Sequence, residues 1–391
     1  MPRPDRLRRP AALDVLAVVL LGAGLVLVAT GGLPASAARA TLDRALPLLV
    51  FLAAVVVLAE LLAAAQVFDV VATRMTIAAG GSYPRLFGLC VLFASATTSF
   101  LNLDTTAVLL TPVMLAVAGR AGAQRLALAM TTVWFANIAS LLLPVSNLTN
   151  LLAADRVGLP ARSFAARMWL PQLAAIAVGA ACLWVFYWRR RDEDRYVPPE
   201  PLRPADRVLF RVAAADAAAF AVAVLAGVPL PPAAVGAAVV IVAAYAVRRR
   251  DRLTVTLFPL RLLVLVVGLF LVLGAADRTG FGTFLRSLVG DGVWRTAGTG
   301  AVLANAVNNL PAYVAVEAAV PTGHADQLLA LLIGTNVGPL VLPWGSLATV
   351  IWFERVRSAG VTVELRRFVL TGLVTAVLTL AAAVGVLVLT G

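Results

Sequence analysis

The chain has no lysine, one histidine and two cysteines, and all 32 of its basic residues are arginine. An ATP-binding P-loop requires a lysine, so the chain does not power itself with ATP through that motif. His324 lies in a short polar loop, which argues against both a histidine metal site and a Ser–His nucleophile pair. Cys90 and Cys182 lie inside apolar runs and indicate neither a disulfide framework nor a thiolate metal site. We therefore expect no enzyme activity, no metal site and no cofactor.

Charged residues are also scarce. They make up 13% of the chain, against 61% hydrophobic residues, and the mean hydropathy is +0.94. A soluble domain is nearer half apolar and about one quarter charged. The net charge of +12 comes from short arginine runs between apolar segments, a pattern typical of membrane topology signals. The composition predicts an all-α polytopic membrane protein that contacts the lipid bilayer and binds no nucleic acid.

Several apolar segments are long enough to cross a bilayer, which takes roughly 20 residues. They lie near residues 11–32, 45–66, 126–155, 170–188, 208–226, 229–247, 257–275, 325–354 and 368–390. The first segment follows a cluster of arginines and precedes Ala35-Ser36-Ala37, which resembles a signal-peptide cleavage site. Its length favours an uncleaved first helix.

Two further apolar segments, near 83–119 and 297–320, carry polar residues at their middles. Each is predicted to be a re-entrant hairpin whose tip stops halfway across the membrane. The same order of elements therefore occurs twice in the chain. It predicts a first repeat at 1–188, a central cytoplasmic loop with a linking helix at 189–228, and a second repeat at 229–391.

The single crossing in the linking helix inverts the second repeat relative to the first. Inverted repeats with interrupted helices are typical of secondary transporters, and their solute sites lie near the midplane of the membrane. We expect the two hairpin tips to meet there. Most arginines fall in segments that are cytoplasmic if the N-terminus is inside, so we predict a plasma (inner) membrane protein with a cytoplasmic N-terminus and an outside C-terminus. Arg156, Arg162 and Arg167 depart from this trend.

Two interrupted segments match each other residue by residue. They run from Asn137 to Asn150 and from Asn336 to Thr349, and they align without a gap. Pro144 and Pro343 occupy the same offset, and proline disfavours continued helix. Because backbone polar groups in hydrocarbon must be satisfied internally, a helix that stops there indicates a cavity or a ligand.

The hairpin tips are rich in amides and hydroxyls, which suit a cation, an oxyanion or a neutral polyhydroxyl solute. Aligned on the apolar segments that follow the tips, Asp104 pairs with Asn309. An acid within the membrane is a functional hypothesis by default, so Asp104 is a candidate to carry a coupling proton. It is equally placed to cap a helix, and one residue can do both. Glu60 is a second candidate for proton transfer. Asp216 is interpreted as structural, and Glu317 is open between the two roles.

The predicted site residues fall into three groups. Solute or ion binding is assigned to Asn102, Asp104, Thr105, Thr106, Ser146, Asn147, Thr149, Asn150, Asn305, Asn308, Asn309, Ser346 and Thr349. Proton coupling is assigned to Asp104 and Glu60. Support of the site is assigned to Asn137, Pro144, Asn336 and Pro343.

From about residue 45 to 390, the chain resembles the arsenical pump membrane subunit family, within the ion transporter superfamily that also holds citrate, dicarboxylate and sodium/proton carriers. The most specific motifs are Asn308-Asn309-Leu-Pro311, Asn336-Val-Gly-Pro339 and Gly345-Ser-Leu-Ala-Thr349. The chain departs from the family at the first tip, where Asn102-Leu103-Asp104 has one amide fewer. It also has Asn336 where arsenite carriers can have an acid.

The resemblance implies proton-coupled efflux of arsenite or antimonite, with tip amides and hydroxyls binding the solute and Asp104 carrying the proton. The alternatives are a sodium-coupled dicarboxylate or citrate carrier and a sodium/proton antiporter; a non-transporting membrane enzyme or assembly factor is a remote one. The coupling ion is H+ or Na+. Other possible partners are a separate ATPase subunit and a second copy of the chain in a homodimer.

Overall fold

The computed structural model describes residues 12–189, 195–276, 281–321 and 323–390. Within these residues all regular elements are helices, and eight of the helices are long and apolar enough to cross a membrane. This confirms the predicted all-α polytopic class. The ends of the chain and the charged run 190–194 of the predicted central loop lie outside the described residues.

The first half of the chain contains nine α-helices. Their bounds are α1 (Ala12–Ala29), α2 (Ala35–Ala64), α3 (Val67–Ala78), α4 (Tyr83–Leu101), α5 (Leu103–Thr105), α6 (Thr111–Ala121), α7 (Arg125–Ile138), α8 (Leu148–Val157) and α9 (Ala161–Leu183). A π-helical turn, Thr106–Leu110, joins α5 to α6, and a second one, Trp184–Trp188, follows α9. The apolar segment 126–155, predicted to be interrupted, consists of two short helices, α7 and α8, with the interruption between them.

The second half repeats this order after the linking helix α10 (Arg207–Leu225). Its bounds are α11 (Leu230–Arg248), α12 (Leu260–Ala276), α13 (Phe281–Val289), α14 (Val293–Val307), α15 (Asn309–Glu317), α16 (Ala325–Val337), α17 (Leu347–Ser358) and α18 (Leu365–Leu389). Helices α3 and α13 hold equivalent places in this order, each directly before a hairpin. The interrupted pair α16 and α17 corresponds to α7 and α8.

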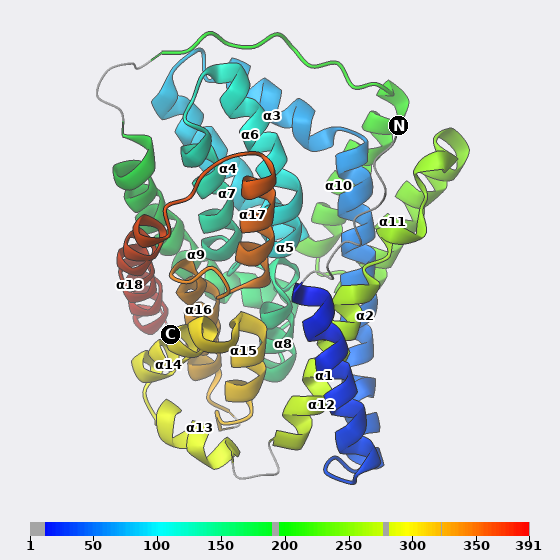
Figure 1. Cartoon of the computed structure of the whole chain (residues 1–391), viewed down its shortest axis with the longest axis vertical. Coiled ribbons are helices and arrows are strands. Elements are labelled where there is room, and N and C mark those ends of the chain that lie inside the picture. Colours follow the sequence, from blue (N-terminus) through cyan, green and yellow to red (C-terminus); the bar gives the residue numbers. More distant parts are fainter. Residues whose placement is uncertain (1–11, 190–194, 277–280, 322, 391) are drawn as a thin grey trace, which may run out of the picture.

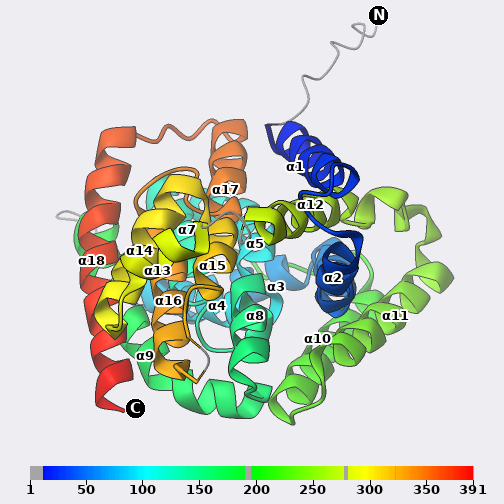
Figure 2. The ribbon, with the colours of Figure 1, turned by 90° about the horizontal axis from the view of Figure 1, so that it is seen from below.

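The helices form two groups that lie side by side (Figures 1 and 2). Helices α1, α2, α10, α11 and α12 make one group; α9, α14, α16 and α18 belong to the other. The packing is reciprocal between the halves of the chain: α1 packs on α12 as α11 packs on α2, and α4 packs on α7 as α14 packs on α16. Sequence-equivalent helices thus occupy equivalent places.

Both predicted hairpins are present. The Tyr83 hydroxyl at the start of α4 donates to the Ala121 carbonyl at the end of α6, 3.3 Å away, so the two arms run antiparallel. In Figure 1 the α4–α6 hairpin lies in the upper half of the molecule and the α14–α15 hairpin in the lower half. The position of the hairpins in a bilayer stays a prediction.

The backbone corrects the predicted register of the tips. Asn102 ends α4 with φ of 111°, and Asn308 ends α14 with φ of 88°. With ψ of 164° and 153°, both asparagines lie in a positive-φ region that residues other than glycine rarely adopt, and both reverse the chain at equivalent points. Asp104 is therefore equivalent to Leu310, and the predicted pairing of Asp104 with Asn309 is wrong by one residue. The π-helical turn Thr106–Leu110 after the first tip adds one residue that the regular helix α15 lacks, so alignment on the apolar segments is displaced by one position at the tips.

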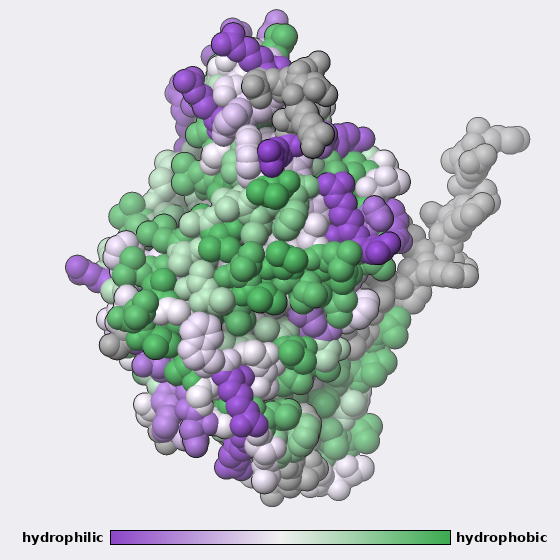
Figure 3. Space-filling view, turned by 90° about the vertical axis from the view of Figure 1, so that its left-hand side faces the viewer, coloured by the Kyte–Doolittle hydropathy of each residue, from purple (hydrophilic) through white to green (hydrophobic). Residues whose placement is uncertain are grey.

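The outer surface suits a bilayer. Figure 3 shows an apolar band across the face that includes α9 and α18, with polar residues above and below it. Leu370, Leu373 and Val377 of α18 are exposed on the molecule, as are Trp169 and Leu173 of α9. Exposed apolar side chains in such number mark a lipid-facing surface.

Arg167, one of the three arginines that depart from the charge trend, has partners at the end of the molecule where α9 begins. Its guanidinium lies 2.6 Å from an Asp326 carboxylate oxygen and also donates to the Thr390 carbonyl. The arginine thus ties α9 to the start of α16 and to the end of α18. A local ion pair explains its position there.

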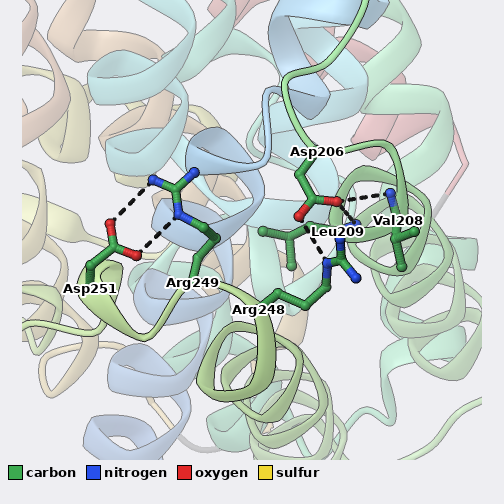
Figure 4. Close-up of polar contacts among 6 residues, drawn as sticks. All are labelled: Asp206, Val208, Leu209, Arg248, Arg249 and Asp251. Carbon is green, nitrogen blue, oxygen red and sulfur yellow. Dashed lines mark hydrogen bonds and ion pairs between the residues drawn. The ribbon is translucent and has the colours of Figure 1, made fainter.

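An extended strap, residues 195–206, connects the two groups of helices at the opposite end. Tyr196 donates its backbone N–H to Gly81, and Ala205 donates its backbone N–H to the Gln66 side chain, each at 2.8 Å. At the end of the strap Asp206 caps α10 through the amides of Val208 and Leu209. It also pairs with Arg248 of α11 at 2.8 Å (Figure 4).

The α14–α16 crossing provides a test of close helix packing. A Cβ at Gly334 would overlap the Ala297 carbonyl, whereas a Cβ at Gly298, next along α14, would meet open space. We expect Gly334→Ala to lower the free energy of unfolding by about 1–3 kcal/mol. Gly298→Ala should be neutral or stabilising by up to ~1 kcal/mol. Thermal unfolding of both purified variants in detergent checks this, and equal midpoints would contradict so close a crossing of the two helices.

The Asp206 cap generates a pH prediction. The hydrogen bond from Arg248, followed by the amide of Leu209, lowers the pKa of Asp206 below its ordinary value. A lowered pKa adds stability above the unfolded-state value of about 4 and loses it as pH falls through the folded value. Asp206→Asn should therefore lower the melting temperature slightly at neutral pH. The difference from wild type should vanish in acid and shrink in high salt, since the pair is partly exposed. A pH-independent difference would show that the charge of Asp206 plays no part.

Candidate functional site

The first interruption lies between α7 and α8, and its backbone is satisfied by side chains. Asn147 caps α8 by accepting from the Thr149 amide. Gln172 of α9 accepts from the Leu141 amide at 2.8 Å and donates to the Ile138 carbonyl at 2.9 Å. Asn150 donates to the carbonyls of Ser140 and Leu143. These bonds replace the helical ones that the interruption removes.

The second interruption uses a different set of residues for the same purpose. Ser346 caps α17 by accepting from the Thr349 amide at 3.1 Å. Asn305, on the α14 arm of the second hairpin, accepts from the Leu342 amide at 3.0 Å and donates to the Gly338 carbonyl at 2.8 Å. The second hairpin is thus bonded directly to the second interruption.

One asparagine joins the two halves of the chain. The fully buried Asn336 side chain accepts from Asn147 at 2.8 Å and from the Thr149 hydroxyl at 2.9 Å, and it donates to Asn150 at 2.8 Å. Its counterpart Asn137 reaches Thr349 at 3.4 Å. The Asn137 Oδ1 atom is buried without a hydrogen-bond partner among the described residues.

The two hairpin tips line one pocket of about 90 Å³. Its polar lining consists of Asn102 and Asp104 from the first tip, Asn308 and Asn309 from the second, and Asn147 from the first interruption. The remaining lining is apolar and comes largely from α1, α2 and α12. We call it the central pocket. Since a water molecule occupies ~30 Å³, its size suits a small solute.

A second space, of about 270 Å³, also includes Asp104. Glu60, Thr105, Arg261 and Glu354 line it together with apolar side chains of α2, α12 and α17. We call it the acidic cavity. Asp104, Leu262, Leu265 and Leu347 border both spaces, so Asp104 lies at their boundary.

Asp104 contacts the start of a helix from the other half of the chain. The backbone amide of Ala348, the second residue of α17, lies within reach of its carboxyl group. Its Oδ1 atom is buried and has no hydrogen-bond partner in the described part of the chain. A carboxylate with unused acceptor capacity can receive a proton or a solute hydroxyl.

The structure sorts the predicted residues into two sets. Asn102, Asp104, Asn147, Asn308 and Asn309 line the central pocket, and Glu60 and Thr105 line the acidic cavity. The others line neither space and bond within the protein: Thr106, Ser146, Thr149, Asn150, Asn305, Ser346 and Thr349, with the support residues Asn137 and Asn336. The support residues Pro144 and Pro343 also line neither space. Solute contact by these residues stays a prediction.

Two support residues were missed from the sequence. Gln172 follows Pro171 in the middle of the apolar α9, and a polar residue at such a place is itself a signal. Ser140 lies within the first interruption, where its carbonyl accepts from Ser146 and Asn150.

Asp216 and Glu317 are buried and line neither space. Within the described residues no group of three His, Cys, Asp or Glu side chains could hold a metal ion.

The chain is similar to known membrane transport proteins. Residues 7–334 match the family model described as citrate transporter. The chain belongs to the citrate transporter family. It is 28% identical over 352 residues to the arsenical pump membrane protein of Escherichia coli (strain K12), covering 82% of this chain and 81% of that one. It is 24% identical over 349 residues to the putative arsenical pump membrane protein of Bacillus subtilis (strain 168), covering 78% of each.

A solved structure supports the fold. The YdaH transporter of Alcanivorax borkumensis aligns with 96% of both chains, at a TM-score of 0.57 and 12% identity. The resemblance inferred from the motifs is thus confirmed. This member of the citrate transporter family is a multi-pass membrane protein and a secondary transporter, not an enzyme.

The unequal bonding of Asn336 and Asn137 predicts unequal effects of mutation. Asn336→Leu leaves buried groups of Asn147, Thr149 and Asn150 without partners, at a cost of about 1–3 kcal/mol for each group left unsatisfied. Asn137→Leu breaks fewer bonds and removes an oxygen that already lacks a partner, so it should cost roughly 1 kcal/mol. Unfolding of the purified variants, followed by tryptophan fluorescence, measures the difference. Equal destabilisation would contradict this unequal bonding.

Proposed function

We propose that the protein exports arsenite, antimonite or a similar small neutral inorganic solute by exchange for protons. The observation that carries the proposal is the central pocket, where four amides and one carboxyl group from both hairpin tips and one interruption surround about 90 Å³. Amides and a carboxyl group suit a solute with several hydroxyls, since they offer both donors and acceptors. The curated relatives named arsenical pump membrane proteins support the same solute.

In this proposal Asp104 carries the coupling proton. It borders both spaces, so a proton can reach it from the acidic cavity while a solute occupies the central pocket. Glu60 lines the same cavity and provides a second carboxyl group for proton transfer. Solute and proton would compete for the free Asp104 oxygen, which is the requirement for exchange.

Two alternatives belong to the same superfamily. One is a sodium-coupled citrate or dicarboxylate carrier, and the family description, citrate transporter, supports its citrate solute. A sodium/proton antiporter would use the same carboxyl groups. Against an organic anion, no arginine lines the central pocket among the described residues; Arg261 lines the acidic cavity. We therefore place these alternatives second.

Transport in this proposal uses inverted repeats with re-entrant hairpins and alternating access around the central pocket. The N-terminus is cytoplasmic and the C-terminus outside, in the plasma membrane. A separate ATPase subunit and a homodimer are partners that the proposal allows and does not require.

Everted membrane vesicles from cells without their own arsenic exporters test the proposal. An imposed proton gradient should drive arsenite uptake by the wild type, since the cytoplasmic face is outward in such vesicles. Asp104→Asn should abolish the response to the gradient, because an amide cannot carry the proton. Glu60→Gln should slow uptake without abolishing it, since Glu60 supplies the proton to Asp104. Uptake is measured with and without an uncoupler.

The outcomes separate the parts of the proposal. Gradient-driven uptake that survives Asp104→Asn would keep the solute and remove Asp104 from coupling. No uptake by folded wild-type protein would reject arsenite and favour a sodium-coupled or organic-anion carrier. Asp251→Asn, an exposed substitution beyond the end of α11, serves as the expression-matched control.

A further inference from the structure

The first turn of α17 is already occupied by an acid of the protein itself. The Asp104 carboxyl group, which comes from the first hairpin tip, lies within reach of the Ala348 amide and beside Leu347 in the lining of both spaces. Helix α5, which contains Asp104, packs on α17. Leu347, the first residue of α17, borders both the central pocket and the acidic cavity. The amide end of this helix therefore lies at the proposed solute route.

Free amides and the helix dipole make such an end attractive to anions. A solute carboxylate in the central pocket would seek the same amides. Because Asp104 already holds this position, an incoming anion meets its negative charge whenever the carboxyl group is ionised, where it would otherwise find a positive field. At close range in a partly buried site this repulsion is on the order of a hundredfold or more in affinity.

The second hairpin has no acid at the position equivalent to Asp104. The position equivalent to Asp104 is Leu310, and α15 packs on α8 as α5 packs on α17. Both ends face the central pocket, through Leu148 of α8 and Leu347 of α17. Only the α17 end carries an acid, so the charge is a local departure from the repeat and not a requirement of the fold.

The charged side chains along the rest of the proposed solute route are also mostly negative. Glu60 and Glu354 line the acidic cavity with a single arginine, Arg261, and the central pocket has no basic side chain in its lining within the described part of the chain. A polyanion would thus meet acids along the cavity before it reached Asp104.

We propose that Asp104 acts as a tethered anion at the start of α17 and makes the central pocket select neutral hydroxylated solutes against carboxylates and oxyanions. This inference rests on the proposed function in placing the solute in the central pocket. It assigns Asp104 a role in specificity that is separate from carrying a proton. The role needs the charge and position of the side chain, whatever ion drives transport.

Binding of radiolabelled succinate to the purified full-length protein tests the inference. Asp104→Ser removes the charge and frees the Ala348 amide, so succinate should bind at least ~10-fold more tightly than to wild type. Asp104→Asn removes the charge and keeps the bulk, so it should give a smaller gain. Asp251→Asn removes one charge far from the pocket and should give none.

Two results would overturn the inference: succinate binding by wild type that matches Asp104→Ser, or no gain in a folded Asp104→Ser protein. If Asp104→Ser does not fold, equal succinate binding by wild type and Asp104→Asn overturns it instead. Arsenite flux by wild type in proteoliposomes reports separately on the proposed function. Absence of that flux with a succinate gain in the variants would reject arsenite and retain the tethered anion.

Discussion

Every backbone amide and carbonyl within a membrane needs a partner from the protein, and this chain interrupts its helices at both hairpin tips and in both matched segments. Side chains provide the missing partners. Asn102 accepts from the amide of Thr105 at 2.9 Å. Gln172 bonds Ile138 and Leu141 where α7 ends, and Asn305 bonds Gly338 and Leu342 where α16 ends. The arrangement of the central pocket depends on these bonds, because they fix where each helix stops.

This constraint makes the two halves interdependent. Asn336 belongs to the second half, yet it bonds the cap and first turn of α8 in the first. In return Trp352 of α17 donates to the Ala129 carbonyl of α7 at 2.8 Å. The central pocket is therefore formed jointly, and neither half could hold it alone. Within this near-symmetric frame Asp104 is the exception, and the chemistry of the pocket follows from that one residue.

The sequence predicted the helical class, both hairpins, both interruptions and the meeting of the tips. It could do so because proline, asparagine and serine in the middle of apolar runs are local signals with a clear physical meaning. No such local signal marked which residue of one tip is equivalent to which residue of the other. The turns at Asn102 and Asn308 are set by backbone conformation, and the π-helical turn Thr106–Leu110, which adds one residue after the first tip only, has no distinct signature in the apolar sequence.

By itself, the sequence determined that this chain lies in a membrane, breaks its helices twice in matched order and places an acid at one tip. The tertiary structure alone decided which amides face the pocket and which bond the backbone. Asn147 and Asn150 lie three residues apart, yet Asn147 lines the pocket and Asn150 turns to the carbonyls of the interruption. Their side chains have the same chemistry, so only the packing of neighbouring helices, which leaves space beside one and carbonyls beside the other, could separate them.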